Sequence, residues 1–213
     1  MNVNIIDEQY NWVNKLNKRN NTDYIVFHHE AGYGTAQNIH QTHLNNGWSG
    51  IGYHFYVRMD GSIYEGRPID TIGAHTENFN KVSVGVCAEG YYHTRYDSKK
   101  FDIEMPIKQK NSLVLIGKYL KELYPNAKIV AHRDLNNTLC PGKYFPFDEI
   151  KEQILFKEEI DIMLEKWQEE LGLKSLNELV KKKIIDSPDE HKDKMGENVP
   201  YWLFFAVLNK IKK

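Results

Sequence analysis

The chain has 213 residues, 41% of them hydrophobic, and a formal net charge of −1. This length allows one domain with a hydrophobic core plus an appendage, and the near-neutral charge excludes a strong field that would recruit nucleic acid. The mean hydropathy of −0.60 and the lack of a long apolar run exclude a membrane span, while two cysteines cannot build a disulfide framework.

The first residues lack the basic start and the long apolar stretch of a secretory signal, so we expect synthesis in the cytoplasm without a signal peptide. Apolar residues then recur at roughly helical spacing over residues 4–18, which predicts a helix. A continuous apolar, β-prone run over residues 24–27 predicts a central strand. Two histidines, His28 and His29, follow this strand directly.

Thr35 is a suitable N-cap for a helix over residues 36–46, which Gly47 would end. His40 and His43 are three residues apart on this helix. They form either a metal-binding pair or, as we expect, part of a solvated face.

Asp60-Gly61 lies between two β-prone runs, residues 53–59 and 62–67, and this dipeptide is a strong hairpin signal. Tyr53 and His54 stand at the start of the first run. Tyr53 is either a core tyrosine with its hydroxyl satisfied or a group at the functional site. We interpret His54 as structural.

A further strand is predicted over residues 83–88, and the carboxylate of Glu89 after it acts either as a general base or as a cap of the strand. Pro106 suits the first turn of a helix over residues 107–124, whose apolar residues recur at i, i+3, i+4 spacing. A strand over residues 128–131 follows. The order of elements indicates an α/β fold, with a mixed central β-sheet flanked by helices.

The last of these strands leads into a short irregular loop with an imidazole and a thiol near its two ends, His132 and Cys140. Imidazole nitrogen and thiolate sulfur both suit zinc, and a third ligand would come from the strand that ends in two histidines. Three protein ligands leave one coordination position open for water, and zinc lowers the pKa of such a water to about 7. The implied chemistry is metal-assisted hydrolysis.

Six short motifs occur in order along the chain. They are Phe27-His28-His29-Glu30-Ala31-Gly32, Gly52-Tyr53-His54-Phe55-Tyr56-Val57, Gly73-Ala74-His75-Thr76, Ser83-Val84-Gly85-Val86-Cys87, Ala131-His132-Arg133-Asp134 and Cys140-Pro141-Gly142. This set resembles the zinc-dependent N-acetylmuramoyl-L-alanine amidases, a family that includes amidase-type phage endolysins and animal peptidoglycan recognition proteins. The resemblance covers residues 23–154. It implies hydrolysis of the amide bond between N-acetylmuramic acid and L-alanine in bacterial cell-wall peptidoglycan.

The resemblance implies that the zinc ligands are His28, His132 and Cys140. In the family motif the first histidine of the pair is the ligand, so His29 should point to the opposite face of the strand. One thiolate and two neutral imidazoles leave a zinc site with a net charge of +1, which preserves the Lewis acidity of the metal.

The resemblance also implies that Tyr53 and Thr138 stabilise the oxyanion formed during amide cleavage. It places His75 at the edge of the substrate groove, although the residue could instead be an ordinary surface histidine. Glu89 is the candidate general base, but some relatives carry a carboxylate where this chain has Cys87. Aromatic residues after Glu89 should line a wall of the groove, namely Tyr91, Tyr92 and Tyr96.

The composition becomes charged and helix-prone after residue 154, which divides the chain into a catalytic domain, 1–156, and a helical C-terminal segment, 157–213. The segment resembles the small helical modules that follow the catalytic domain in endolysins of Gram-positive hosts, which implies wall targeting. Dimer formation and completion of the fold are the alternatives. Its lysine runs either contact anionic wall polymers or are simply solvated.

Two other functions compete with the amidase. A non-catalytic peptidoglycan-binding protein of this family would typically lack the cysteine ligand, which is present here as Cys140. A cysteine hydrolase would use Cys140 with His132 and need no metal. The expected lack of a signal peptide favours a phage endolysin over a bacterial autolysin, made in the host cytoplasm and reaching the wall after release.

Overall fold

The computed structural model describes residues 3–94, 101–156, 174, 178 and 181–182. The chain divides into two units, Met1–Phe156 and Lys157–Lys213. The expected wall-targeting module, 157–213, lies almost wholly outside the described residues. The aromatic Tyr96 also lies outside them. Within the part of the chain that is described, no helix is long and apolar enough to cross a bilayer.

The first unit is built on one six-stranded mixed sheet, with strand order β1-β4-β3-β5-β2-β6. The central strand β2 pairs in parallel with β5 on one side and with β6 on the other. Strand β3 runs parallel to β5, and β4 is antiparallel to β3. The strands are β1 (Ile6–Asp7), β2 (Tyr24–His29), β3 (Phe55–Val57), β4 (Ile63–Glu65), β5 (Ser83–Ala88) and β6 (Lys128–Ala131).

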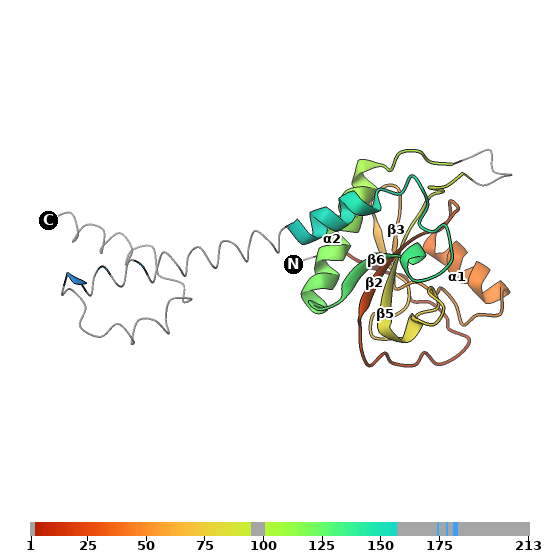
Figure 1. Cartoon of the computed structure of the whole chain (residues 1–213). Helices are drawn as coiled ribbons and strands as arrows, with labels where there is room; N and C mark the ends of the chain where they lie inside the picture. The colour runs from red at the N-terminus through yellow and green to blue at the C-terminus, as the bar shows by residue number, and fades with distance from the viewer. Residues whose placement is uncertain (1–2, 95–100, 157–173, 175–177, 179–180, 183–213) are drawn as a thin grey trace. The chain divides into compact units, whose positions relative to one another are not determined.

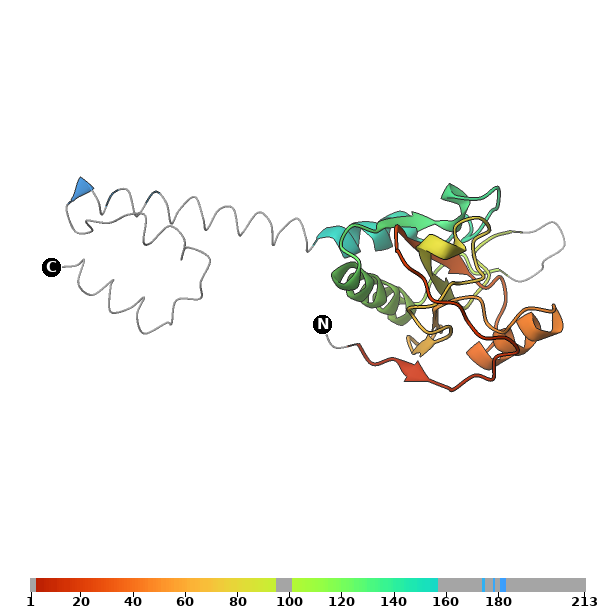
Figure 2. The same ribbon diagram turned by 90° about the horizontal axis from the view of Figure 1, so that it is seen from below.

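Two helices, α1 (Ala36–Asn45) and α2 (Ile107–Leu123), lie on opposite sides of this sheet (Figures 1 and 2). Because side chains alternate along a strand, β2 presents Ile25 and Phe27 to the α2 side, where they join the larger apolar core. The α1 side holds a smaller apolar cluster that includes Tyr56 and Cys87. The predicted mixed sheet flanked by helices is therefore confirmed.

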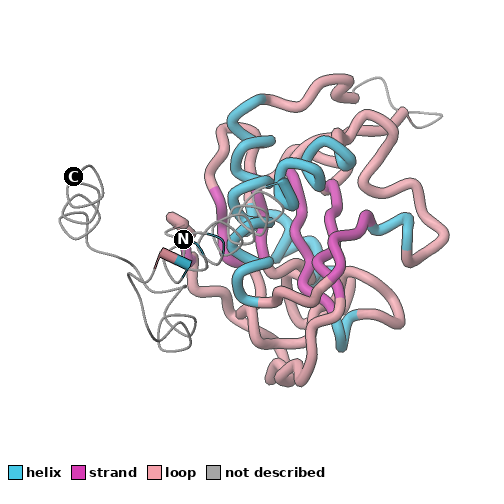
Figure 3. The backbone as a smooth tube through the Cα atoms, turned by 60° about the vertical axis from the view of Figure 1, so that its left-hand side comes forward, coloured by secondary structure: helices cyan, strands magenta, loops and turns pink. Residues whose placement is uncertain are grey.

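Most predicted elements of the first unit are present, some with shorter bounds. Helix α1 begins after the expected N-cap, since the Thr35 hydroxyl accepts a hydrogen bond from the Asn38 amide at 3.1 Å. The predicted hairpin is confirmed but shorter at both strands, and Gly61 supplies the positive φ of +91° that its turn requires. Long loops connect the strand ends (pink in Figure 3).

The predicted helix over residues 4–18 is wrong. The segment is extended, and its only regular element is the two-residue strand β1, which pairs with Tyr64 and Glu65 of β4. Its aromatic residues act as separate anchors: Tyr10 stacks on His40 at a ring distance of 4.7 Å, and Trp12 lies edge-on to the same imidazole. Individual contacts of this kind outweigh the weak helical periodicity.

One helix was not predicted, at residues 147–156. It contributes the buried side chains of Phe147, Ile150 and Ile154 to the larger core. Ile154 packs so closely on α2 that a Cβ at Gly117 would lie 2.2 Å from its Cδ1 atom. The helix therefore closes the α2 side of the core.

Candidate active site

Strand register brings two histidines together. Phe27 of β2 pairs with Ala131 of β6, so the next residues, His28 and His132, leave the same edge of the parallel sheet side by side. His132 opens a short 3-10 helix, η2 (His132–Asp134). The carboxyl edge of parallel strands is where α/β proteins commonly build their sites.

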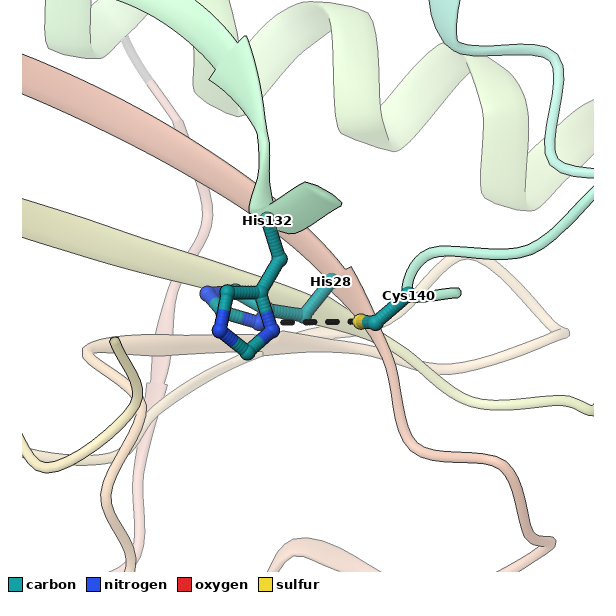
Figure 4. A group of neighbouring side chains, drawn as sticks. All are labelled: His28, His132 and Cys140. Atoms are coloured by element: carbon teal, nitrogen blue, oxygen red, sulfur yellow. Dashed lines mark hydrogen bonds between the residues drawn. The ribbon is translucent and has the colours of Figure 1, made fainter. Parts of the chain in front are cut away.

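The loop after η2 brings Cys140 back to the two histidines. The amide of Arg133 donates to the carbonyl of Cys140 at 2.9 Å, which closes the loop at its base. The Cys140 sulfur lies 3.7 Å from Nδ1 of His28 and 3.8 Å from the carbonyl oxygen of His29. Three residues distant in the sequence thus meet at one point (Figure 4).

The three side chains form a group that could hold a metal ion. One ligand atom from each of His28, His132 and Cys140 lies within 4.8 Å of the others. The two imidazole rings are tilted at 54°, with centroids 4.5 Å apart, so they do not stack face to face. Two nitrogens and one sulfur are a donor set that suits zinc.

The protonation states of the two imidazoles fit a metal site. Burial lowers the pKa of His28 well below its usual value, and the neighbouring His132 acts in the same direction. Burial also lowers the pKa of His132, against a hydrogen bond with Asn136 that raises it. Both imidazoles are therefore neutral at pH 7, as metal ligands must be.

The Cys140 thiol is the opposite case. Burial raises its pKa to about 12, although a backbone hydrogen bond with His29 and the charge of Arg133 act in the opposite direction. Without a metal the group is a protonated thiol at neutral pH and a poor nucleophile, because the thiolate is the reactive form. Coordination to a cation would favour the thiolate directly.

Two cavities flank the three-residue group. The first, about 560 Å³, is lined by His43, Trp48, His75 and Glu77 among others. The second, about 470 Å³, lies on the side of His28, His29, Tyr91 and Leu139. Three residues line both cavities: Tyr53, His132 and Thr138. We call these three shared residues the ridge. An extended substrate that lies in both cavities would cross the candidate metal-binding group there.

The two expected oxyanion donors both lie on this ridge. The Tyr53 ring is 5.2 Å from the His28 ring. Burial, and then Cys87 and Cys140, raise the pKa of Tyr53 well above its usual value, so the hydroxyl keeps its proton. The Thr138 hydroxyl accepts a hydrogen bond from the Cys140 amide at 3.3 Å and so retains its own proton for donation.

His75 was expected at the edge of the substrate groove, and it lines the first cavity, but most of its side chain is buried. Its side chain is buried among Gly73, Gly85 and Ser83, and its Nδ1 atom lies 3.0 Å from Nε2 of His28. The residue contributes to the lining of the first cavity. Its imidazole therefore lies behind a candidate metal ligand, where it can orient that ligand.

Glu89 does not lie at the ridge either. Its carboxylate accepts hydrogen bonds from the Arg58 guanidinium at 3.0 and 3.1 Å and from the Met59 amide at 3.0 Å. It lines neither of the two cavities. The alternative role weighed for this residue, a cap after the strand, fits these contacts, and we leave Glu89 out of the catalytic set.

Other expectations for histidines and aromatic residues were mixed. His40 is buried and bonded to Asn11 and Ile51, so the expected solvated face of α1 is wrong. Tyr91 lines the second cavity, but Tyr92 is fully buried and bonds Gln109 in the core. His54 is structural, as predicted, because its ring bonds the backbone at both nitrogens.

Sequence reasoning missed two residues of the first cavity. His43 accepts a hydrogen bond from the Gly52 amide at 3.0 Å, and its ring lies 4.5 Å from the half-exposed Trp48. Burial lowers the pKa of His43 to about 4. The glycine-rich stretch after Trp48 was the available signal, because it lets the backbone approach the helix closely.

Comparisons with known proteins agree with this geometry. The model of the N-acetylmuramoyl-L-alanine amidase family matches residues 18–143. The endolysin of Klebsiella phage KP32 is 32% identical over 132 residues, covering 60% of this chain and 85% of the endolysin. Peptidoglycan-recognition protein LB of Drosophila melanogaster is also 32% identical over 132 residues, covering 56% of this chain and 54% of that protein.

A solved structure with a similar fold is the N-acetylmuramoyl-L-alanine amidase LysC from Clostridium intestinale. It has a TM-score of 0.66 and 36% identity, covering 72% of this chain and 98% of that one. The fold and these relatives thus define an amidase with an α/β fold that acts on peptidoglycan. The chain belongs to the N-acetylmuramoyl-L-alanine amidase family. Its enzymatic activity is that of an N-acetylmuramoyl-L-alanine amidase.

The placement of Glu89 gives a first prediction. Glu89→Gln removes the charge that pairs with Arg58, so we expect the free energy of unfolding to fall by about 1–3 kcal/mol while kcat for peptidoglycan stays near wild type. Glu149→Gln is the matched control: it breaks the ion pair of Lys110 with a half-exposed carboxylate, so about 1 kcal/mol or less should be lost. Urea unfolding and peptide release measure the two effects. A hundredfold loss of kcat at unchanged stability would restore Glu89 as the general base.

Proposed function

We propose that the protein is a zinc-dependent endolysin that hydrolyses the amide bond between the lactyl group of N-acetylmuramic acid and L-alanine. The observation that carries this proposal is the convergence of His28, His132 and Cys140 between two cavities, with two hydroxyl donors on the same ridge. The related phage endolysins and the LysC amidase support it.

The three donors fit zinc by their chemistry. Neutral imidazoles and a thiol with no cation hydrogen-bonded to its sulfur are a poor constellation for acid–base work alone, but a good ligand set. A zinc ion held by them supplies Lewis acidity, which polarises a carbonyl group and acidifies water. No carboxylate base has to be added to this scheme, in keeping with the position of Glu89.

The chain's own residues bind and orient the scissile amide. An extended glycopeptide would place its sugar and its peptide in the two cavities, so that the amide carbonyl meets the shared ridge. Tyr53 holds its proton on the phenolic oxygen and donates it in a hydrogen bond to the carbonyl oxygen as negative charge develops there. Thr138 adds a second hydrogen bond from a neutral hydroxyl.

Both competing functions fit less well. A cysteine hydrolase needs a thiolate, and burial raises the pKa of Cys140 to about 12, with no cationic side chain among the described residues hydrogen-bonded to the sulfur. A non-catalytic peptidoglycan-binding protein of this family typically lacks the cysteine ligand, whereas Cys140 is present and points at His28. The proposed zinc amidase accounts both for the presence of Cys140 and for its position beside His28.

The proposed substrate sets the place of action at the bacterial cell wall. Similarity to several phage endolysins supports a role in release of phage progeny from a host that makes the enzyme in its cytoplasm. We retain wall-polymer binding as the proposed role of residues 157–213, which lie almost wholly outside the described residues.

Product analysis tests the proposed bond directly. Digestion of purified wall should release peptide stems that begin with a free L-alanine amine and leave glycan strands with intact lactyl groups. Mass spectrometry distinguishes these products from reducing sugars, which a glycosidase would release, and from peptides cut within the stem. Either of those products, in the absence of free L-alanine termini, would contradict the proposal.

Metal binding should distinguish the two adjacent histidines. We expect His28→Asn to abolish zinc binding and activity, whereas His29→Asn keeps both, because the new amide oxygen can still accept the Tyr92 amide hydrogen bond made by His29. Zinc content measured by plasma mass spectrometry and competition with a chromophoric chelator provide the readout. The wild-type enzyme should lose activity to a strong chelator and regain it with zinc. Equal loss of zinc in both variants would remove the assignment of His28.

Tyr53 should act on turnover rather than on metal binding. We expect Tyr53→Phe to reduce kcat by about 100- to 1,000-fold, because one oxyanion donor is lost, while zinc content and KM change little. Tyr64→Phe, at a partly buried tyrosine that lines neither cavity, is the matched control and should keep wild-type turnover. Steady-state kinetics on soluble peptidoglycan fragments measure both. An unchanged kcat in Tyr53→Phe would exclude the hydroxyl from catalysis.

A further inference from the structure

The buried imidazole of His75 lies directly behind His28. Nδ1 of His75 is 3.0 Å from Nε2 of His28 and 2.8 Å from the Thr76 hydroxyl, which is itself 3.4 Å from Nε2 of His28. The two rings meet edge to face, with centroids 5.0 Å apart and planes at 86°. Nε2 of His28 therefore faces a small group of polar atoms on the side away from Cys140.

The other nitrogen of His75 fixes the direction of these hydrogen bonds. Its Nε2 atom lies 3.4 Å from the Ser83 hydroxyl oxygen, and that hydroxyl donates its own proton to the Phe79 carbonyl at 2.8 Å. Ser83 can therefore only accept from His75, so the ring proton of neutral His75 sits on Nε2. Nδ1 of His75 then carries a lone pair and must accept.

The proton position on His28 follows from that on His75. Since Nδ1 of His75 accepts, Nε2 of His28 carries the proton and donates it. Nδ1 of His28 is then left with its lone pair, and this is the atom that faces the Cys140 sulfur at 3.7 Å. The reverse direction would set a lone pair on Nε2 of His75 against an oxygen of Ser83 whose proton is already used.

We propose that His75 is a positioning residue that fixes the tautomer and the ring orientation of His28, so that Nδ1 of His28 is the ligand atom for zinc. This inference rests on the proposed zinc site and deepens it. Residues that accept the second N–H of a metal-binding histidine typically change metal affinity by about 10- to 100-fold when they are replaced.

The surroundings of His75 suit an orienting role. A Cβ at Gly85 would lie 2.6 Å from the His75 ring, and one at Gly73 would lie 2.4 Å from it, so the ring is enclosed by backbone on two sides. The Asn80 side chain accepts hydrogen bonds from the amides of His75 and Thr76 at 2.8 and 2.9 Å. The imidazole is thus held in one place before any metal arrives.

The tautomer can be read without metal and without activity. In the full-length, metal-free protein at pH 7.5, long-range ¹H–¹⁵N correlation spectra should identify His28 as the Nε2–H tautomer and His75 likewise as Nε2–H. A His28 proton on Nδ1 would overturn the proposal. This measurement needs no zinc, so its result is independent of the proposed function. If the protein bound no zinc at all, the proposed zinc enzyme would be refuted, but the spectra would still test the direction of the hydrogen bond.

A pair of variants separates orientation from packing. His75→Phe keeps a ring but removes the acceptor, and we expect the zinc dissociation constant to rise by about 10- to 100-fold. His75→Asn places an amide oxygen near the lost Nδ1 atom and should restore most of the affinity. Chelator competition gives the constants, and the melting temperature of the metal-free protein gives the packing effect. If His75→Phe does not fold, the spectra and the zinc affinity of His75→Asn still test the positioning role of His75.

A folded His75→Phe protein with wild-type zinc affinity would refute the positioning role. Equal affinity losses in both variants, in step with their melting temperatures, would also count against it, because a purely structural side chain gives that result.

Discussion

The parallel pairing of β2 with β6 is the constraint on which the site depends. The register that sets Phe27 opposite Ala131 leaves His28 and His132 adjacent at one edge of the sheet, and a shift of one residue would turn His28 to the α2 side of the sheet. That register is in turn fixed by apolar side chains of β2, such as Ile25 and Phe27, buried against α2. Packing of the core on one face therefore determines the chemistry at the edge.

The other face of the sheet tolerates a group of buried imidazoles because each has partners. His54 bonds the Thr71 carbonyl and the Gly85 amide, and His75 bonds His28 and Thr76. Arg19 lies beside His54 and donates to backbone carbonyls. Apart from the Arg19 guanidinium, the network consists of neutral imidazoles and their hydrogen-bond partners, and such bonding is rigid, whereas an unpaired buried group would be costly. The His75 imidazole therefore supports His28 as a neutral group.

Sequence patterns predicted those parts that local rules control. The strands over residues 24–27, 83–88 and 128–131 could be read from apolar runs, and α1 from Thr35 and its periodicity. His132 and Cys140 were recognised as zinc-suited donors at the two ends of one loop, and the family motif selected His28 from the pair of histidines that ends a strand. The helix expected at residues 4–18 failed because the segment is held by separate aromatic contacts to other elements, which no local pattern records.

Side-chain placement after a strand was harder to predict than the strand. Glu89 follows β5 as expected, yet its direction is set by Arg58 and Met59 in the hairpin, 31 and 30 residues earlier. His75 was expected at a groove edge and lines the first cavity, but its ring packs into the space left by the missing side chains of Gly73 and Gly85, so it is largely buried. The direction of such a side chain depends on its tertiary neighbours. The sequence therefore indicated which residues to consider for the site, but not the role of each.

In the proposed enzyme, the loop from His132 to Cys140 would couple metal binding to oxyanion stabilisation. The Cys140 amide donates to the Thr138 hydroxyl, so the residue that offers a ligand sulfur also orients an oxyanion donor two positions earlier. A hydroxyl held in this way contributes a directed hydrogen bond but no full charge. The remaining stabilisation then falls on Tyr53, whose raised pKa keeps it a donor beside the thiol of Cys140. The candidate site is therefore one in which neutral donors, fixed by the backbone of a single loop and by the edge of the sheet, surround the three candidate metal ligands.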